Sequence, residues 1–213
     1  MICGIDEAGR GPVIGPMVVA AVCADDEKLK DLNVRDSKKL SPKRREYLAE
    51  RIKEMAEQIV VRVVDPEEID TMREKMTMNE LEVEIFAEII SELKGDIVYV
   101  DAADVDEERF AQEIRKRVCR EVKIISKHKA DSIYPIVSAA SIIAKVERDR
   151  IIEEIAKEIG DFGSGYPADE RTKKFLEEYY REHGELPPHT RRSWKSSKRL
   201  IKKSEQRHLG DFL

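Results

Sequence analysis

Two adjacent carboxylates followed by a glycine-bracketed arginine are the residues of this chain best suited to chemistry. Asp6 and Glu7 end an apolar strand, and Gly9-Arg10-Gly11 follows one residue later. Packing does not explain the pair, because a buried unpaired carboxylate is costly and two neighbouring carboxylates repel. A divalent cation would remove both costs, while the glycines allow close approach of the backbone and the arginine favours an anionic ligand. Metal beside phosphate is typical of an enzyme that acts on phosphodiesters.

Two further carboxylates lie at the ends of predicted elements. Asp101 ends the strand 97–101, and Asp131 lies at the start of a long helix. The carboxyl ends of neighbouring strands are where α/β proteins place their sites, and hard oxygen ligands favour Mg²⁺ or Mn²⁺. Plainer interpretations exist: Asp101 as a turn residue, and Asp131 as a helix N-cap, which is favoured for Asp131 taken alone. Asp6 and Glu7 point to opposite faces of a regular strand and share a site only if the strand bends or ends there.

Several basic residues are candidates for binding phosphate. The loop 36–39 offers Ser37 and Lys38, although a solvated charge run explains these residues equally well. Lys145 follows Ser141 by four residues and shares one helix face with it. It either binds phosphate or is simply solvated.

Tyr166 stands between Gly165 and Pro167, which places an aromatic ring on a rigid turn. Such a ring is suited to stack on a sugar or base. The alternative is an anchor packed on the core. Trp194 is interpreted as a core residue.

The composition indicates a globular chain with a substantial core. It has 213 residues, 41% of them apolar, and no apolar run long enough for a membrane span. No signal peptide is recognised, so we expect a cytoplasmic protein without membrane association. The three cysteines, Cys3, Cys23 and Cys119, have no metal-binding spacing and are expected to be reduced and buried.

Charge is distributed unevenly along the chain. The net charge is −5, which alone argues against a nucleic-acid binder, yet residues 171–213 hold 12 Lys and Arg against 6 Asp and Glu. An acidic body with a basic C-terminal part fits a metal-using enzyme with a phosphate-binding arm. A pair of solvated amphipathic helices explains the charge equally well.

The order of predicted elements defines an α/β fold in which a mixed five-stranded sheet is flanked by helices and followed by a C-terminal helical extension. Predicted strands are 2–6, 13–24, 59–64, 97–101 and 122–126, and predicted helices are 41–58, 78–94, 106–118, 132–159, 170–182 and 190–204. We divide the chain into a catalytic domain (1–162), a basic helical region (163–205) and a flexible tail (206–213).

Several motifs together are similar to those of one known family. They are residues 4–16 with Gly4-Ile5-Asp6-Glu7-Ala8-Gly9-Arg10-Gly11-Pro12, Asp36-Ser37-Lys38-Lys39-Leu40, Tyr99-Val100-Asp101-Ala102, Lys127-His128-Lys129-Ala130-Asp131, the segment 138–146, and Gly163-Ser164-Gly165-Tyr166-Pro167. The chain resembles the type 2 ribonucleases H, specifically ribonuclease HII of archaeal type, over about residues 2–195. Its catalytic strand begins at residue 2, whereas the type 3 relatives carry an added N-terminal domain.

This resemblance implies an RNase H-like fold and hydrolysis of the RNA strand of RNA/DNA hybrids. It also implies incision on the 5′ side of ribonucleotides embedded in duplex DNA, with 5′-phosphate and 3′-hydroxyl products. The family's metal-binding catalytic acids fall on Asp6, Glu7, Asp101 and Asp131, which would hold two Mg²⁺ or Mn²⁺ ions. Gly9, Arg10 and Gly11 would contact the ribose 2′-hydroxyl and a nearby phosphate. Tyr166 would stack on the adjacent sugar.

The last eight residues resemble a box that binds the sliding clamp PCNA. Its anchor positions are Gln206, Leu209, Phe212 and Leu213, with Leu in place of the usual final aromatic residue. The alternative is a frayed tail. We expect a monomeric enzyme that binds hybrid or ribonucleotide-containing duplex and PCNA.

Two rival functions follow from parts of the same evidence. A non-catalytic, hybrid-binding clamp adaptor would keep the basic arm and the tail but would not need four acids. A Mg²⁺-dependent phosphohydrolase of small molecules would not need the basic C-terminal helices. Nicking of a duplex with one embedded ribonucleotide distinguishes all three.

Overall fold

The protein is described here by a computed structural model covering residues 1–25, 29 and 40–210, with the backbone alone for residues 205–210. The candidates Ser37, Lys38, Phe212 and Leu213 lie outside the described residues, as do the side chains of Gln206 and Leu209. The described chain forms two compact units. The first comprises residues 1–8, 18–63 and 76–149, and the second comprises residues 9–17, 64–75 and 150–213.

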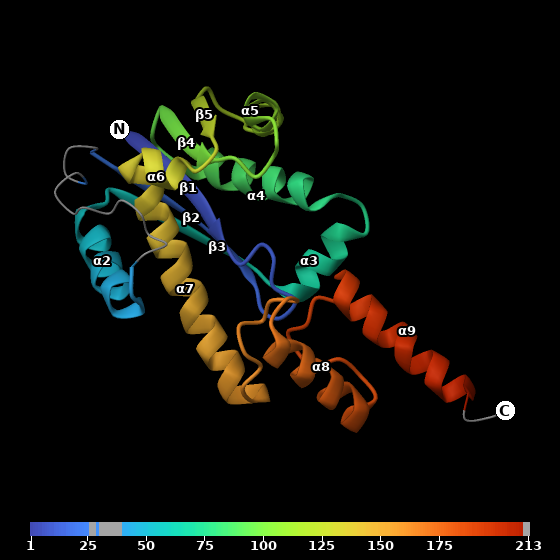
Figure 1. Cartoon of the computed structure of the whole chain (residues 1–213). Helices are drawn as coiled ribbons and strands as arrows, with labels where there is room; N and C mark the ends of the chain where they lie inside the picture. Colours follow the sequence, from blue (N-terminus) through green and yellow to red (C-terminus); the bar gives the residue numbers. More distant parts are fainter. Residues whose placement is uncertain (26–28, 30–39, 211–213) are drawn as a thin grey trace. The chain divides into compact units, whose positions relative to one another are not determined.

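A mixed five-stranded sheet has the strand order β3-β2-β1-β4-β5 (Figure 1), which confirms the predicted sheet. Its strands are β1 (Ile2–Ala8), β2 (Met17–Ala24), β3 (Gln58–Val64), β4 (Ile97–Asp101) and β5 (Lys123–Lys127). β1 pairs antiparallel with β2, so that Asp6 lies opposite Ala20. β1 also runs parallel to β4, and β4 runs parallel to β5. The carboxyl ends of β1, β4 and β5 therefore meet at one edge.

Most helices of the described chain begin after a residue whose side chain accepts a hydrogen bond from a backbone amide of the first turn. They are α2 (Pro42–Met55), α3 (Pro66–Arg73), α4 (Met78–Glu92), α5 (Glu107–Arg115), α6 (Ala130–Ile133), α7 (Pro135–Ile159), α8 (Glu170–His183) and α9 (Lys195–Gly210). The Ser41 hydroxyl caps α2 and Pro42 is its first residue, as predicted. Thr77 and Glu80 form a reciprocal capping box at α4. None of the helices in the described part of the chain is long and apolar enough to cross a membrane.

Three element predictions need correction. The predicted strand 13–24 begins only at Met17, because Gly15 has a φ of 92° and Pro16 precedes the ladder. The predicted helix 132–159 is two helices, since Pro135 lacks the amide that would continue the first one. α9 continues six residues beyond the predicted end at residue 204. α3 was missed altogether, because its eight residues carry little apolar periodicity.

Gly4 lets α7 approach the centre of the sheet. A Cβ built on Gly4 would lie 2.4 Å from the backbone oxygen of Ile136, in the first turn of α7. No side chain fits there, since the obstacle is backbone. The glycine thus sets the distance between β1 and the first half of α7, which carries Ser141 and Lys145.

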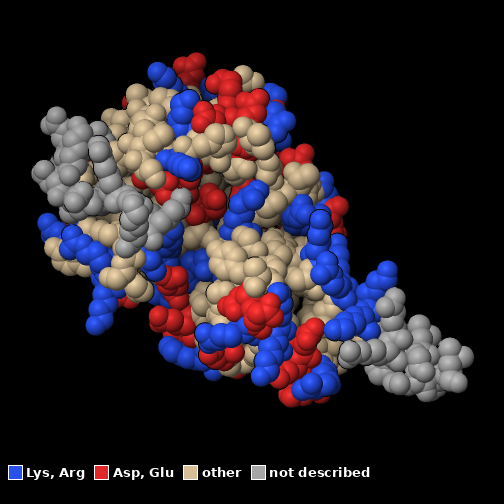
Figure 2. Space-filling model, in the orientation of Figure 1, with Lys and Arg blue, Asp and Glu red and all other residues tan. Residues whose placement is uncertain are grey.

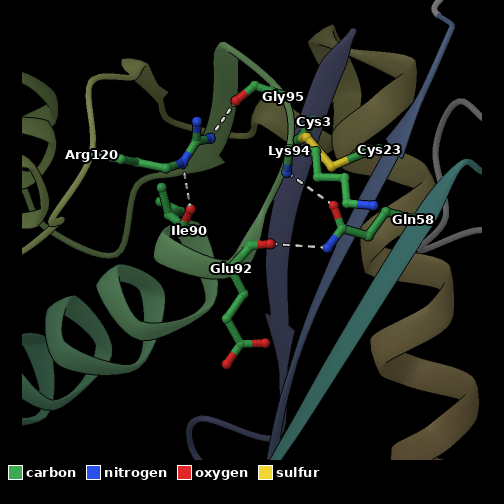
Figure 3. The surroundings of a disulfide bond; sticks show 8 residues. All are labelled: Cys3, Cys23, Gln58, Ile90, Glu92, Lys94, Gly95 and Arg120. Carbon is green, nitrogen blue, oxygen red and sulfur yellow. Dashed lines mark hydrogen bonds between the residues drawn. A yellow bond between two sulfur atoms is a disulfide. The ribbon is translucent and has the colours of Figure 1, made fainter.

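The cysteine prediction was correct for the burial of Cys3 and Cys23 but wrong for their reduced state. Cys3 and Cys23 face each other in the β1–β2 ladder and form a disulfide (Figure 3), with a sequence separation of 20. Both residues are fully buried. Cys119 is free, as predicted, but it is exposed rather than buried. In the same region, the Gln58 side chain accepts a hydrogen bond from Lys94 N and donates one to Glu92 O, each at 3.0 Å.

The second unit has a small core of its own. Its buried residues are Val13, Ile14, Ile155, Phe162 and Leu176, and Trp194 packs against them, as predicted for a core residue. The segment 13–14 is held by the loop before Tyr166, because Gly165 O accepts hydrogen bonds from Val13 N at 2.7 Å and Ile14 N at 3.3 Å. The segment carrying Gly9-Arg10-Gly11 and the loop carrying Tyr166 are therefore joined within one unit.

Candidate active site

Asp6 and Asp101 lie at the same edge of the sheet, on adjacent parallel strands. Ile5 lies opposite Val100 in the β1–β4 register, and Asp101 is the last residue of β4. Asp6 is buried, with an exposed fraction of 5%. The Asp101 carboxylate accepts a hydrogen bond from Ala130 N at 3.0 Å, which links the end of β4 to the start of α6. The sheet thus brings together acids that are 95 residues apart in the sequence.

The surroundings of Asp6 are dominated by burial and by other acids. Burial raises its pKa well above the ordinary value, and the charges of Glu7 and Asp101 raise it further. Two groups from α7 act in the opposite direction: a side-chain hydrogen bond with Ser141 and the charge of Lys145 lower the pKa. Lys145 Nζ also donates to Ser141 Oγ at 2.8 Å. The site therefore has excess negative charge, which α7 offsets only in part.

Asp131 lies next to the same edge of the sheet, on α6. It is 2% exposed, and Ser132 Oγ donates to its Oδ1 at 3.3 Å. The N-cap of α6 is Lys129, in the left-handed conformation with φ of 55°, so the interpretation of Asp131 as an N-cap is wrong. A buried carboxylate in the first turn of a helix that packs on β4 has a position that fits a site residue.

The donor set fits a hard divalent cation. All four acids offer carboxylate oxygens, which Mg²⁺ and Mn²⁺ prefer, and the mutual repulsion of Asp6, Glu7 and Asp101 is what such a cation would relieve. The arrangement is not a preformed cage: within the described ranges, no group of three or more His, Cys, Asp or Glu side chains is spaced to hold a metal ion. The chemistry of the donors, rather than their spacing, supports a metal.

The Gly9-Arg10-Gly11 segment belongs to the second unit and is held by a residue that sequence reasoning missed. Arg191 is completely buried. Its guanidinium donates to Gly9 O at 2.5 Å and to Arg10 O at 2.9 Å. Gly9 has a φ of 83°, so this turn requires a residue that tolerates the left-handed region. Nothing local in the sequence distinguishes Arg191 from the neighbouring Arg192, since the contact spans about 180 residues.

Tyr166 presents its ring beside the same segment. The side chain is 43% exposed, and a Cβ built on Gly11 would lie 3.4 Å from the ring. A ring that is half accessible and lies against a glycine leaves room for another flat group. This geometry agrees with a stacking role and does not support a mere core anchor.

Asp169 fixes the turn that carries Tyr166. Its carboxylate accepts hydrogen bonds from Ser164 N at 2.8 Å and from Ser164 Oγ at 2.7 Å. These bonds to Ser164, followed by one from Arg171 N, lower the pKa of Asp169 to about 2. The same side chain caps α8. Asp169 was not singled out in the sequence analysis.

Basic residues of the C-terminal part are concentrated on α9, in the second unit. Lys and Arg side chains gather along α9 (Figure 2). The basic residues of α9 whose side chains are described are Lys195, Lys198, Arg199, Lys202 and Lys203. A groove of about 360 Å³ lies between α8 and α9 and is lined by three of these residues, Lys195, Arg199 and Lys203, together with Lys173, Leu176 and Leu200. Lys198 and Lys202 are not among its lining residues.

A mixed five-stranded sheet flanked by helices, with acids at the carboxyl ends of its strands, defines an enzyme of the RNase H-like class. The ribonuclease HII family model matches residues 3–197. The chain belongs to the ribonuclease HII family, whose members are metal-dependent endoribonucleases.

The relatives span nearly the whole chain. A ribonuclease HII from Thermococcus kodakarensis is 54% identical over 209 residues, covering 96% of this chain and 91% of that protein. The ribonuclease H2 from Pyrococcus horikoshii has a similar crystal structure, with a TM-score of 0.91, 46% identity and coverage of 96% and 99%. The ribonuclease HII in a PCNA complex from Archaeoglobus fulgidus has a TM-score of 0.86, 48% identity and coverage of 94% and 96%.

Proposed function

We propose that this protein is an endonuclease that hydrolyses the RNA strand of RNA/DNA hybrids and incises on the 5′ side of ribonucleotides embedded in duplex DNA. The products are a 5′-phosphate and a 3′-hydroxyl. The observation that carries the proposal is the buried Asp6 carboxylate, whose pKa is raised by burial and by the adjoining Glu7 and Asp101. A cluster of negative charges at the carboxyl edge of a sheet is suited to a cation that binds a phosphodiester. Membership of the ribonuclease HII family supports an RNA-containing duplex as the substrate.

Asp6, Glu7, Asp101 and Asp131 are the residues that would hold two Mg²⁺ or Mn²⁺ ions. When bound, such ions activate water and stabilise the charge that develops on the leaving oxygen. The chain itself orients the ligands. The hydrogen bond with Ser141 and the charge of Lys145 favour the ionised form of Asp6, which is the form that binds a cation.

Substrate recognition rests on groups that distinguish ribose from deoxyribose. Gly9, Arg10 and Gly11 contact the 2′-hydroxyl and a nearby phosphate, and the half-exposed ring of Tyr166 stacks on the neighbouring sugar. Lys145, Ser37 and Lys38 add phosphate contacts. Basic side chains of α9 contribute charge attraction that is independent of sequence.

The C-terminal tail binds a PCNA-type sliding clamp. The supporting observations are the residue types at Gln206, Leu209, Phe212 and Leu213 and the similarity to the ribonuclease HII of the Archaeoglobus fulgidus PCNA complex. Clamp binding would deliver the enzyme to newly replicated duplex. The enzyme acts as a monomer. The tail adds affinity for DNA that carries a clamp.

A nicking assay tests the catalytic proposal. The substrate is a labelled DNA duplex with one internal ribonucleotide, run beside an all-DNA duplex and a long hybrid. We expect Mg²⁺-dependent cleavage 5′ of the ribonucleotide, no cleavage of the all-DNA duplex, and loss of cleavage in Asp101→Asn. Binding without cleavage by the wild type would instead support the non-catalytic clamp adaptor. Hydrolysis of small phosphate esters alone would support a phosphohydrolase.

A further inference from the structure

Arg191 is the largest fully buried side chain of the described residues, and its guanidinium lies among backbone carbonyls. Nη2 donates to Gly9 O at 2.5 Å, Nη1 to Arg10 O at 2.9 Å, and Nε to Gly15 O at 2.9 Å. One planar cation therefore gathers carbonyls from both ends of the segment 9–15. A guanidinium is suited to this because its donors are fixed in one plane.

These bonds determine where the amides of the segment point. A trans peptide is planar, with its C=O and N–H directed oppositely. The Gly9 carbonyl shares a peptide with Arg10 N–H, and the Arg10 carbonyl shares one with Gly11 N–H. Because both carbonyls point at the buried guanidinium, the N–H groups of Arg10 and Gly11 point away from it. Two consecutive amides directed to the same side form a donor pair for an oxygen ligand.

The next carbonyl continues the pattern. Gly11 O accepts a hydrogen bond from Trp194 Nε1 at 3.0 Å, and the peptide it belongs to has no N–H, because residue 12 is proline. Arg191 also stacks on the Trp194 ring, with its central carbon 4.7 Å from the ring centre. Arg191 and Trp194 thus act together on three consecutive carbonyls.

The backbone of Arg191 is itself anchored. Its amide donates to Val13 O at 2.8 Å, and its carbonyl accepts from Ser197 Oγ at 2.8 Å. The following amides, Arg192 N and Ser193 N, donate to the Asp70 carboxylate at 2.7 and 2.9 Å. A long side chain with both ends fixed gives a rigid support rather than an adaptable one.

We propose that Arg191 is a positioning residue for ribose recognition: it turns the N–H groups of Arg10 and Gly11 outward as a fixed donor pair for the 2′-hydroxyl and adjoining phosphate. The inference rests on the proposed function for the identity of the ligand. Under this proposal, discrimination between ribose and deoxyribose by Gly9-Arg10-Gly11 depends on Arg191, about 180 positions away in the sequence.

Arg191→Lys is the informative variant. Lysine keeps the positive charge, but an ammonium group cannot reproduce the planar fork that holds Gly9 O, Arg10 O and Gly15 O. The measured quantity is the ratio of two dissociation constants, for an all-DNA duplex and for the same duplex with one ribonucleotide, determined in EDTA so that no cleavage occurs. We expect this ratio to fall toward one, and kcat/KM for nicking to fall about 10- to 100-fold, as the loss of one or two charged hydrogen bonds predicts.

Leu176→Ala is the matched control, because Leu176 is buried in the core of the same unit and its aliphatic side chain cannot hydrogen-bond the carbonyls of the segment 9–15. It should lower the melting temperature at least as much as Arg191→Lys while leaving the ratio of dissociation constants at the wild-type value. An unchanged ratio in Arg191→Lys, or an equal fall in both variants, would overturn the positioning role.

Amide hydrogen exchange separates this proposal from the proposed function. In Arg191→Lys, exchange in a peptide covering residues 9–16 should quicken relative to the β2 peptide, whether or not the wild type cuts ribonucleotides. Faster exchange in Arg191→Lys, together with a wild type that does not nick, would confirm that Arg191 holds the segment 9–15 in place. The same result would refute the proposal that the substrate contains a ribonucleotide. Unchanged exchange in that peptide would refute the inference even if the wild type nicks as expected.

Discussion

Removal of the Cys3–Cys23 disulfide is expected to lower the stability of the protein by a predictable amount. The bridge closes a loop with a sequence separation of 20. In the chain-entropy account, a loop of that length removes roughly 11 cal/mol/K from the unfolded state, or about 3.3 kcal/mol at 25 °C. For a chain of this size that corresponds to a melting temperature lower by roughly 7–13 °C.

The assay is calorimetric unfolding in a Cys119→Ser background, which removes the exposed thiol. One sample is reduced in denaturant and refolded with reductant, because both bridged cysteines are fully buried in the native state. The control is the Cys3→Ala/Cys23→Ala double variant, whose melting temperature should not respond to reductant. Thiol titration of the unfolded wild type without reductant should find the Cys119 thiol alone.

Activity at moderate temperature should survive reduction. Asp6 is held in register by its pairing opposite Ala20 and by the β1–β4 ladder, neither of which requires the bridge. A reductant-induced shift below about 2 °C would refute the entropic reasoning, since it would leave under a third of the expected effect. Three titratable thiols in the unreduced protein would refute the bridge itself.

The remaining predictions concern the site and the tail. Asp6→Asn should lose most nicking activity and gain less stability from millimolar Mg²⁺ than the wild type; because the pKa of Asp6 is raised, its contribution to stability is lost as pH rises, and the metal-free variant should melt higher than the wild type at neutral pH. Tyr166→Ala should impair incision at a single ribonucleotide, in a nicking assay, more than binding to all-DNA duplex, by about 5- to 100-fold for one lost stacking contact. Hydrogen bonds lower the pKa of Asp169 to about 2, so its contribution to folding stability is present above pH 3.8 and is lost as the pH falls toward 2. In acid unfolding, Asp169→Asn should therefore lose less stability between pH 3.8 and 2 than the wild type does. Deletion of residues 206–213 should abolish PCNA binding in calorimetry and leave nicking intact, and equal binding by both proteins would show that the tail pattern arose by chance.

The sequence predicted the sheet because its signals are local. Apolar runs mark the strands, and the sequence places Asp101 correctly at the end of β4, whereas Asp6 lies two residues before the end of β1 at Ala8. Convergence of these two acids then follows from the general arrangement of parallel strands. The role of Asp131 was left open by spacing, and the structure rules out only the N-cap interpretation, because Lys129 takes the cap position.

The missed features all depend on long-range pairing. The Cys3–Cys23 bridge requires the β1–β2 register, which a one-residue shift would destroy. Arg191 is one of several basic residues near the start of a basic helix, and only the fold reveals that it is completely buried. The sequence places Ser141 and Lys145 on one helix face but gives no sign that Ser141 hydrogen-bonds with Asp6.

The charge balance around Asp6 explains why the four acids suit a metal rather than a proton-transfer mechanism. General acid catalysis by a pair of carboxyl groups needs environments that push their pKa values apart, so that one group stays protonated while the other is ionised. Here burial and two further carboxylates raise the pKa, while Ser141 and Lys145 favour the ionised form. The groups that lower the pKa favour the ionised carboxylate, which can bind a cation. Burial and the neighbouring acids make that ionised form unfavourable when no cation is bound. The positive charge of Lys145 is too little to balance the acids, so the remaining negative charge is the feature that a divalent ion would complete.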